Sequence, residues 1–100
     1  QRMQLHLAAV WVNNFVNHLY YLGFDFLKKH QLPAQILFPL IKETAMRIHE
    51  VDPYDAQTGP AKRGDIPTMT RHLNLIEDDT QKALYKLISH SITQTYGKKL

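Results

Sequence analysis

Apolar residues recur along the first third of the chain with the spacing of an α-helix. From about Met3 to Lys29 they return every three or four positions and share one broad face of a helical wheel. That face comprises Leu5, Ala8, Ala9, Val12, Phe15, Val16, Leu19, Tyr20, Leu22, Phe26 and Leu27. Leu7, Val10 and Trp11 fall outside it, so apolar side chains surround most of the predicted helix. We expect a second copy of the chain or another domain to pack against it.

Prolines interrupt the pattern after this helix. Gln31-Leu32-Pro33 ends it, and the next helical segment runs from about Pro33 to Val51. Pro39 lies inside that segment and lacks a backbone N–H. We therefore expect either a kink there or a short turn followed by a helix from Pro39.

Capping residues delimit two further helices. Asp65 is a suitable N-cap for a third helix from about Ile66 to Glu77, and a fourth runs from about Gln81 to Tyr96 and stops at Gly97. No strand-type alternation is present. The predicted architecture is all-α: a bundle of about four helices with one long N-terminal helix, forming a single helical domain over residues 1–100.

Composition narrows the class of protein. A chain of 100 residues, 44% of them hydrophobic, has room for one domain with a core. The absence of cysteine excludes disulfides, zinc–thiolate sites and thiol catalysis, and fits a cytoplasmic location. The N-terminus is no signal peptide, and we expect no membrane-spanning segment. The first residue is Gln1, which suggests that a longer chain was cut. The net charge of +3 is scattered, which argues against nucleic-acid binding.

A polar stripe lies opposite the broad apolar face of the first helix. Its members are His6, Asn13, Asn14, Asn17, His18, Tyr21 and Asp25. Asn13 and Asn17 are four residues apart, as are Asn14 and His18, so their side chains can meet on one surface. Asparagine is a mediocre helix former, which suggests that the amides serve as donors and acceptors. A solvated outer face and hydrogen bonding across a buried helix contact remain alternatives.

The segment from Gln57 to Asp65 reads Gln-Thr-Gly-Pro-Ala-Lys-Arg-Gly-Asp and combines turn-forming, cationic and capping residues. Thr58 and Gly59 open the bend, Arg63 supplies charge, and Gly64 lets backbone N–H groups approach a ligand closely. Such a loop before a helix start suits an anion. An ordinary capped surface loop is the alternative.

Other catalytic patterns are missing. The six histidines have no metal-ligand spacing, and neither a Walker loop nor a nucleophile elbow occurs. His18 is the one histidine beside other polar groups on an otherwise apolar helix. It is a candidate for acid–base work or, equally, a structural histidine.

Three stretches carry a family resemblance. The runs 6–20, 38–45 and 57–65 resemble the C-terminal helical domain of uncharacterised Rossmann-type oxidoreductases. These belong to the wider 6-phosphogluconate dehydrogenase-like, or deazaflavin-dependent NADP reductase-like, superfamily. The resemblance implies the C-terminal domain fold of that superfamily. It also implies a longer parent protein whose N-terminal Rossmann domain holds NAD(P). In that parent, the resemblance implies that this helical domain closes the active-site cleft and contacts a small anionic or polar substrate. It further implies a homodimer formed through the first helix. The chain itself has no G-x-G-x-x-G, so we expect no cofactor on it alone.

One position departs from the related β-hydroxyacid dehydrogenases. Their equivalent helix carries a catalytic lysine three residues before a paired Asn-Asn; here Asn13 and Asn14 resemble the pair, but Val10 occupies the lysine position. The resemblance then leaves Asn14 and His18 as the catalytic candidates. Asn13, Asn17, Thr58, Gly59, Arg63, Gly64 and Asp65 are the candidates for binding substrate or cofactor. The missing lysine keeps open a non-catalytic dimerisation or interaction module of a nucleotide-sensing protein.

Overall fold

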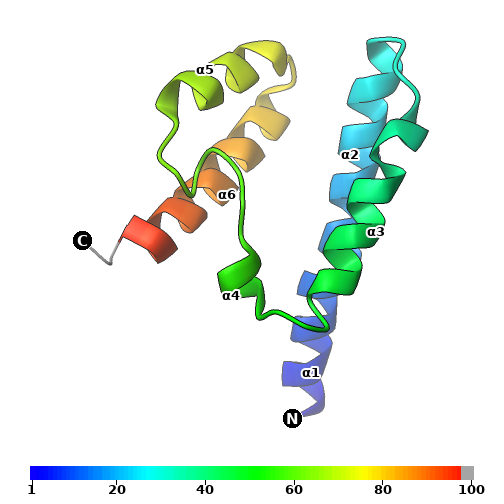
Figure 1. Ribbon diagram of the computed structural model, residues 1–100, viewed down its shortest axis with the longest axis vertical. Coiled ribbons are helices and arrows are strands. Elements are labelled where there is room, and N and C mark those ends of the chain that lie inside the picture. The colour runs from blue at the N-terminus through cyan, green and yellow to red at the C-terminus, as the bar shows by residue number, and fades with distance from the viewer. Residues whose placement is uncertain (98–100) are drawn as a thin grey trace. The chain divides into compact units, whose positions relative to one another are not determined.

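The computed structural model describes residues 1–97 and contains only helices and connecting turns within that range. The chain divides into two compact units, one from Gln1 to His49 and one that begins at Glu50. The expected all-α class with a long first helix is confirmed (Figure 1). Within the part of the chain that is described, no helix is long and apolar enough to cross a bilayer.

The first helix is continuous over 28 residues but not uniform. It consists of α1 (Arg2–Ala9), a π-helical segment η1 (Val10–Phe15) and α2 (Val16–Lys29). The sequence pattern did not indicate the π-helical segment. A helical wheel with a constant angle per residue therefore does not hold across residues 10–15, because a π-helix bonds each N–H to the carbonyl five residues back.

A Schellman motif ends α2 at the predicted place. Gln31 has φ 55°, a left-handed conformation that glycine usually supplies. Its N–H bonds the Lys28 carbonyl at 3.2 Å, and the Leu32 N–H bonds the Leu27 carbonyl at 2.9 Å. These two bonds satisfy carbonyls that the end of a helix leaves without partners, and they reverse the chain.

The reversal leads into a short 3₁₀ turn η2 (Ala34–Leu37) and then α3 (Phe38–Arg47). Pro39 lies in the first turn of α3, so the expected short turn followed by a helix is confirmed. The helix ends at Arg47, four residues before the predicted boundary at Val51. The rings of Phe24 on α2 and Phe38 on α3 lie 6.1 Å apart, and α3 runs back along the first helix (Figure 1).

The second unit contains, up to residue 97, the helices α4 (Pro53–Ala56), α5 (Ile66–Leu75) and α6 (Asp79–Gly97). The short α4 was missed, because no element was predicted between Val51 and Ile66. Its N-cap is Asp52, whose carboxylate accepts the Tyr54 N–H at 2.8 Å.

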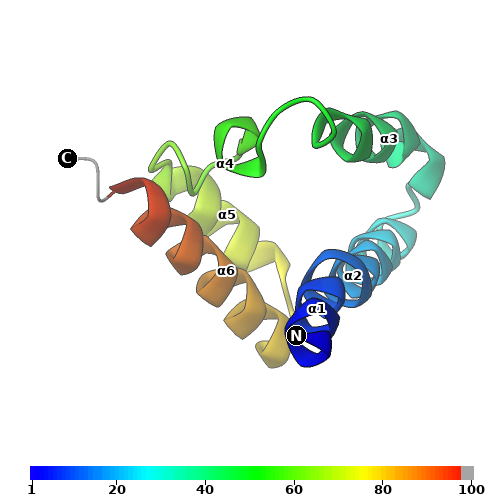
Figure 2. The same cartoon turned by 90° about the horizontal axis from the view of Figure 1, so that it is seen from below.

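The two longer helices of this unit lie close to their predicted positions. Helix α5 begins where expected and stops before Glu77, while α6 begins at Asp79 rather than Gln81 because Asp78 caps it. Helices α5 and α6 lie side by side in both views (Figures 1 and 2). His72 Nδ1 and the Tyr85 hydroxyl join them at 2.7 Å.

The described chain has almost no buried core, contrary to what its apolar content suggested. Ala61 is the one buried hydrophobic residue among residues 1–97, with 6% of its surface accessible. On the first helix, Leu5 is 74% exposed, Val12 73% and Trp11 61%. Amphipathic helices of this kind bury their apolar faces only against another element. The expectation that the first helix exceeds what this chain can cover is consistent with these exposures.

Candidate functional site

The central part of the polar stripe, here called the amide stripe, comprises Asn13, Asn14, Asn17 and His18 and begins inside the π-helical segment. Asn13 and Asn14 belong to η1, whereas Asn17 and His18 lie in the first turn of α2. All four side chains are exposed. A single π-helical turn within an α-helix is rare and often occurs at functional sites. The structure therefore adds a local signal, absent from the sequence pattern, at the two asparagines that the family resemblance singled out.

The stripe presents hydrogen-bonding groups to its surroundings. Among residues 1–97, none of the side-chain hydrogen bonds involves the amides of Asn13, Asn14 or Asn17. Each amide carries an acceptor oxygen and two N–H donors. The imidazole of His18 stacks on the ring of Tyr21, with centroids 5.9 Å apart and planes 20° from parallel. This stacking positions the imidazole near the amides. Asp25, also in the polar stripe, forms a salt bridge with Lys29 at 3.1 Å.

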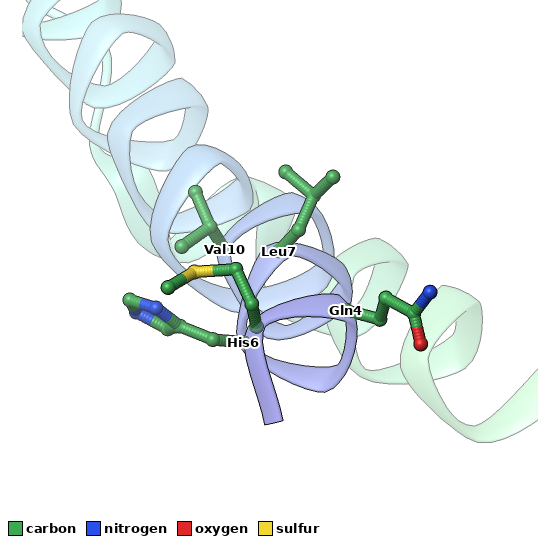
Figure 3. A pocket seen from close by; sticks show the side chains of 5 residues that line it. Gln4, His6, Leu7 and Val10 are labelled. Atoms are coloured by element: carbon green, nitrogen blue, oxygen red, sulfur yellow. The ribbon is translucent and has the colours of Figure 1, made fainter. Parts of the chain in front are cut away.

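A shallow apolar depression lies toward the N-terminal end of the same helix. Its lining comes from Met3, Gln4, His6, Leu7 and Val10 (Figure 3). His6 and Gln4 project to opposite sides of the helix in this view. Val10, the residue at the lysine position of the related dehydrogenases, is half-buried here. This open, mainly apolar surface supplies contact area, and His6 is the only one of its five lining side chains that can exchange a proton.

The loop from Thr58 to Asp65 is folded on itself. Gly59 has φ 102° and Gly64 φ 67°, both in the region that favours glycine. The Gly64 N–H bonds the Ala61 carbonyl at 3.3 Å, and the Asp65 N–H bonds the Pro60 carbonyl at 2.9 Å. These two amides, which were expected to face a ligand, therefore already have partners within the loop.

Asp65 is confirmed as the N-cap of α5. Its carboxylate accepts the Thr68 N–H at 3.2 Å and the Thr68 hydroxyl at 2.7 Å. These two hydrogen bonds hold the pKa of Asp65 below its usual value, with a smaller contribution from the positive charge of Arg63. Arg63 lies at 3.5 Å from the same carboxylate and keeps 60% of its side chain exposed. The Asp65 carboxylate is thus engaged as the N-cap of α5, whereas the Arg63 guanidinium is largely accessible.

Helix α6 contacts the loop at Ala61 and Lys62. The Thr93 hydroxyl donates to the Ala61 carbonyl at 3.4 Å. Lys62 Nζ lies 5.0 Å from the centroid of the Tyr96 ring and donates to the Gln57 carbonyl at 3.1 Å. The Tyr96 ring stacks on that of Tyr54 with centroids 4.7 Å apart, and its hydroxyl donates to the Tyr54 carbonyl.

The amide stripe belongs to the first unit and the loop to the second. The residues that hold the loop were missed in the sequence, since Thr93 lies 32 positions from Ala61 and Tyr96 lies 42 from Tyr54. No spacing rule connects residues so far apart. The predicted roles of the stripe and loop residues stay predictions. Among the described residues, no group of three or more acidic or histidine side chains is arranged to hold a metal ion.

Comparisons with known proteins place this chain in a family. Residues 1–92 match the family described as Domain of unknown function (DUF2520), and the chain belongs to that family. The crystal structure of a putative NADP oxidoreductase from Bacteroides fragilis is similar, with 48% sequence identity and a TM-score of 0.90. The match covers 94% of this chain and 37% of that one. The chain thus spans little more than a third of the length of this relative. A search of curated proteins found no match.

Proposed function

We propose that this chain is the C-terminal helical domain of an NAD(P)-dependent oxidoreductase of the 6-phosphogluconate dehydrogenase-like superfamily. The observation that carries the proposal is the match, at 48% identity and TM-score 0.90, to just over a third of a protein named as a putative NADP oxidoreductase. The remaining length of that relative leaves room for a dinucleotide-binding domain. The described residues contain no strand–turn–helix unit of their own, so the cofactor would be held by an N-terminal domain.

The amide stripe is the proposed substrate side of the cleft. In such an enzyme the nicotinamide supplies or accepts the hydride. Asn13, Asn14 and Asn17 would orient a substrate carbonyl or hydroxyl through their exposed amides. His18 lies about one helical turn from Asn14 and would deliver or remove the proton at the substrate oxygen. Val10 has no proton to exchange, which is why this role falls to His18.

The loop is the proposed anion contact. Arg63 would bind a carboxylate or phosphate, either of a small substrate or of the cofactor, because its exposed guanidinium offers several N–H donors beyond the one near Asp65. Thr58, Gly59, Gly64 and Asp65 would shape the loop around it. The long first helix would form a homodimer through its exposed apolar side chains.

A test of this role uses the full-length protein. Arg63→Ala is expected to weaken binding of NADPH or of a small carboxylate substrate by about tenfold or more, as expected when a charge-assisted hydrogen bond is removed. Titration of the reduced nicotinamide fluorescence and the KM for a panel of carbonyl and imine compounds measure the two ligands. Arg47→Ala, on α3, is the matched control for loss of an exposed arginine. Unchanged affinity for both ligands would remove the loop from the binding site.

A second candidate function is a non-catalytic dimerisation or interaction module of a nucleotide-sensing protein. Val10 at the lysine position and the largely apolar exposed helix favour it. The two functions differ in one measurement. Turnover of reduced nicotinamide with any member of the carbonyl and imine panel, lost in Asn14→Ala and His18→Ala, supports the enzyme. Cofactor binding without turnover supports the module.

A further inference from the structure

The two adjacent cations of the loop have different surroundings. Lys62 is engaged twice, with its ammonium over the Tyr96 ring and within hydrogen-bond distance of the Gln57 carbonyl. Arg63 has one contact among the described residues, at 3.5 Å from the Asp65 carboxylate, and is mostly exposed. Both side chains are exposed, but Lys62 contacts α6 through the Tyr96 ring, whereas the contact of Arg63 is with the Asp65 carboxylate.

Helix α6 provides a fixed support for the Lys62 side of the loop. Thr93 and Tyr96 are three residues apart on α6, so they lie on the same face. Thr93 reaches the Ala61 carbonyl and Tyr96 reaches both Lys62 and Tyr54. Ala61, between these contacts, is the most enclosed hydrophobic residue of residues 1–97. The loop is therefore held at both its backbone and its lysine, while the arginine contacts the Asp65 carboxylate at 3.5 Å.

We infer that Lys62, Thr93 and Tyr96 are positioning residues that fix the loop on α6, and that Arg63 is the one loop cation that meets the anionic group. The ligand part of this inference rests on the proposed function. The assignment of a positioning role to Lys62 and a recognition role to Arg63 follows from their contacts. An ammonium over an aromatic face resists displacement more than a solvated one, and an arginine suits bidentate recognition of carboxylate or phosphate.

The order of the loop can be measured without any ligand. The amides of Gly64 and Asp65 bond to carbonyls inside the loop, so their hydrogen exchange reports directly on loop opening. In the full-length protein, Thr93→Val, Tyr96→Ala and Lys62→Gln are each expected to speed this exchange by about fivefold, the factor for losing one net hydrogen bond or cation–aromatic contact. Tyr96→Phe keeps the ring and is expected to show a smaller increase.

Three matched variants serve as controls. Thr95→Val makes the same change on the same helix, where the hydroxyl donates to the Ser91 carbonyl, and is expected to leave loop exchange unchanged. Arg63→Gln is also expected to leave it near the wild-type rate. Lys62→Arg keeps a cation over the ring and is expected to restore protection. Equal exchange in Thr93→Val, Tyr96→Ala, Lys62→Gln and wild type overturns the inference.

Binding separates the positioning role from the recognition role. With NADPH and inorganic phosphate as probes, Arg63→Gln is expected to lose affinity whereas Lys62→Arg keeps it, and Lys62→Gln is expected to lose it only in proportion to loop opening. A greater loss of affinity in Lys62→Arg than in Arg63→Gln reverses the two roles and overturns the inference. A third outcome separates the two claims. If hydrogen exchange responds as expected but no loop variant changes the affinity for NADPH or phosphate, the positioning of the loop on α6 is supported and the proposed anion contact is contradicted.

Discussion

Asp65 illustrates how one side chain can set the geometry of a whole segment. Its carboxylate caps α5 through Thr68 and lies beside Arg63, while its backbone N–H closes the loop onto the Pro60 carbonyl. The identity of this residue was readable in the sequence, because aspartate before a proline-containing first turn is a strong N-cap pattern. The pattern could not reveal that the Arg63 guanidinium lies 3.5 Å from the same carboxylate.

The depressed pKa of Asp65 predicts a definite pH dependence. A carboxylate whose folded-state pKa lies below its unfolded value of 3.8 contributes stability above that value and loses it as pH falls through the folded-state pKa. Asp65→Asn keeps an acceptor for the cap but does not titrate. The stability difference between wild type and Asp65→Asn is therefore expected to be constant above about pH 5 and to shrink below pH 4. Urea unfolding followed by circular dichroism at several pH values measures it, and a difference independent of pH contradicts the capping role.

At the scale of elements, helix ends were predictable wherever local chemistry decides them. Asp65 begins α5 and the Gln31 region ends α2, as the sequence indicated. Boundaries that depend on hydrogen-bond geometry were not predictable. The π-helical segment Val10–Phe15 and the short α4 contain residues that fit an ordinary helix or loop equally well. Their conformations are settled by small energy differences that single-sequence patterns do not register.

The same substitution is expected to have opposite effects in a helix and in the loop. Gly23 lies inside α2, and a Cβ there meets nothing within 4 Å. Gly23→Ala is therefore expected to stabilise the protein by roughly 0.5–1 kcal/mol. Gly59 also has open space around it but a φ of 102°. Gly59→Ala is expected to destabilise by about 1–2 kcal/mol, because alanine avoids that backbone conformation.

Denaturant midpoints of the two glycine variants measure this contrast. Because neither added methyl group meets a neighbouring atom, the backbone conformation alone sets the sign of each effect. A stabilising Gly59→Ala would show that the loop does not adopt its left-handed bend in solution. A destabilising Gly23→Ala would instead place a partner against that side of α2.

At the scale of the whole molecule, the exposed apolar helix is the dominant feature. Exposed Leu, Val and Trp side chains follow one another along this helix, and proteins rarely expose so much apolar area without a partner. We expect the protein to self-associate through this helix. Trp11, the single tryptophan, provides a fluorescent reporter in the middle of the surface.

The expected association can be tested at Trp11 itself. Trp11→Glu is expected to shift the protein to monomer in sedimentation experiments, because an unpaired charge in an apolar interface is costly to bury. In the wild type, Trp11 emission is expected to move to shorter wavelength as concentration rises. Leu87→Glu on α6, a change at a similarly exposed apolar residue of the second unit, is the control and is expected to leave the association intact. Monomeric wild type, or equal dissociation by both variants, contradicts the role of the first helix.

The sequence by itself determined the helical class, the long first helix and the cap at Asp65, because each depends on interactions between residues at most about a turn apart. Only the structure decided that Lys62 lies over the Tyr96 ring of α6 while Arg63 lies beside Asp65, and that Asn13 and Asn14 belong to a π-helical segment. Contacts such as Thr93 with Ala61 and Tyr96 with Tyr54 join residues separated by several helical turns and a loop. Folding brings such residues together through the combined packing of many side chains, and no local pattern encodes that result.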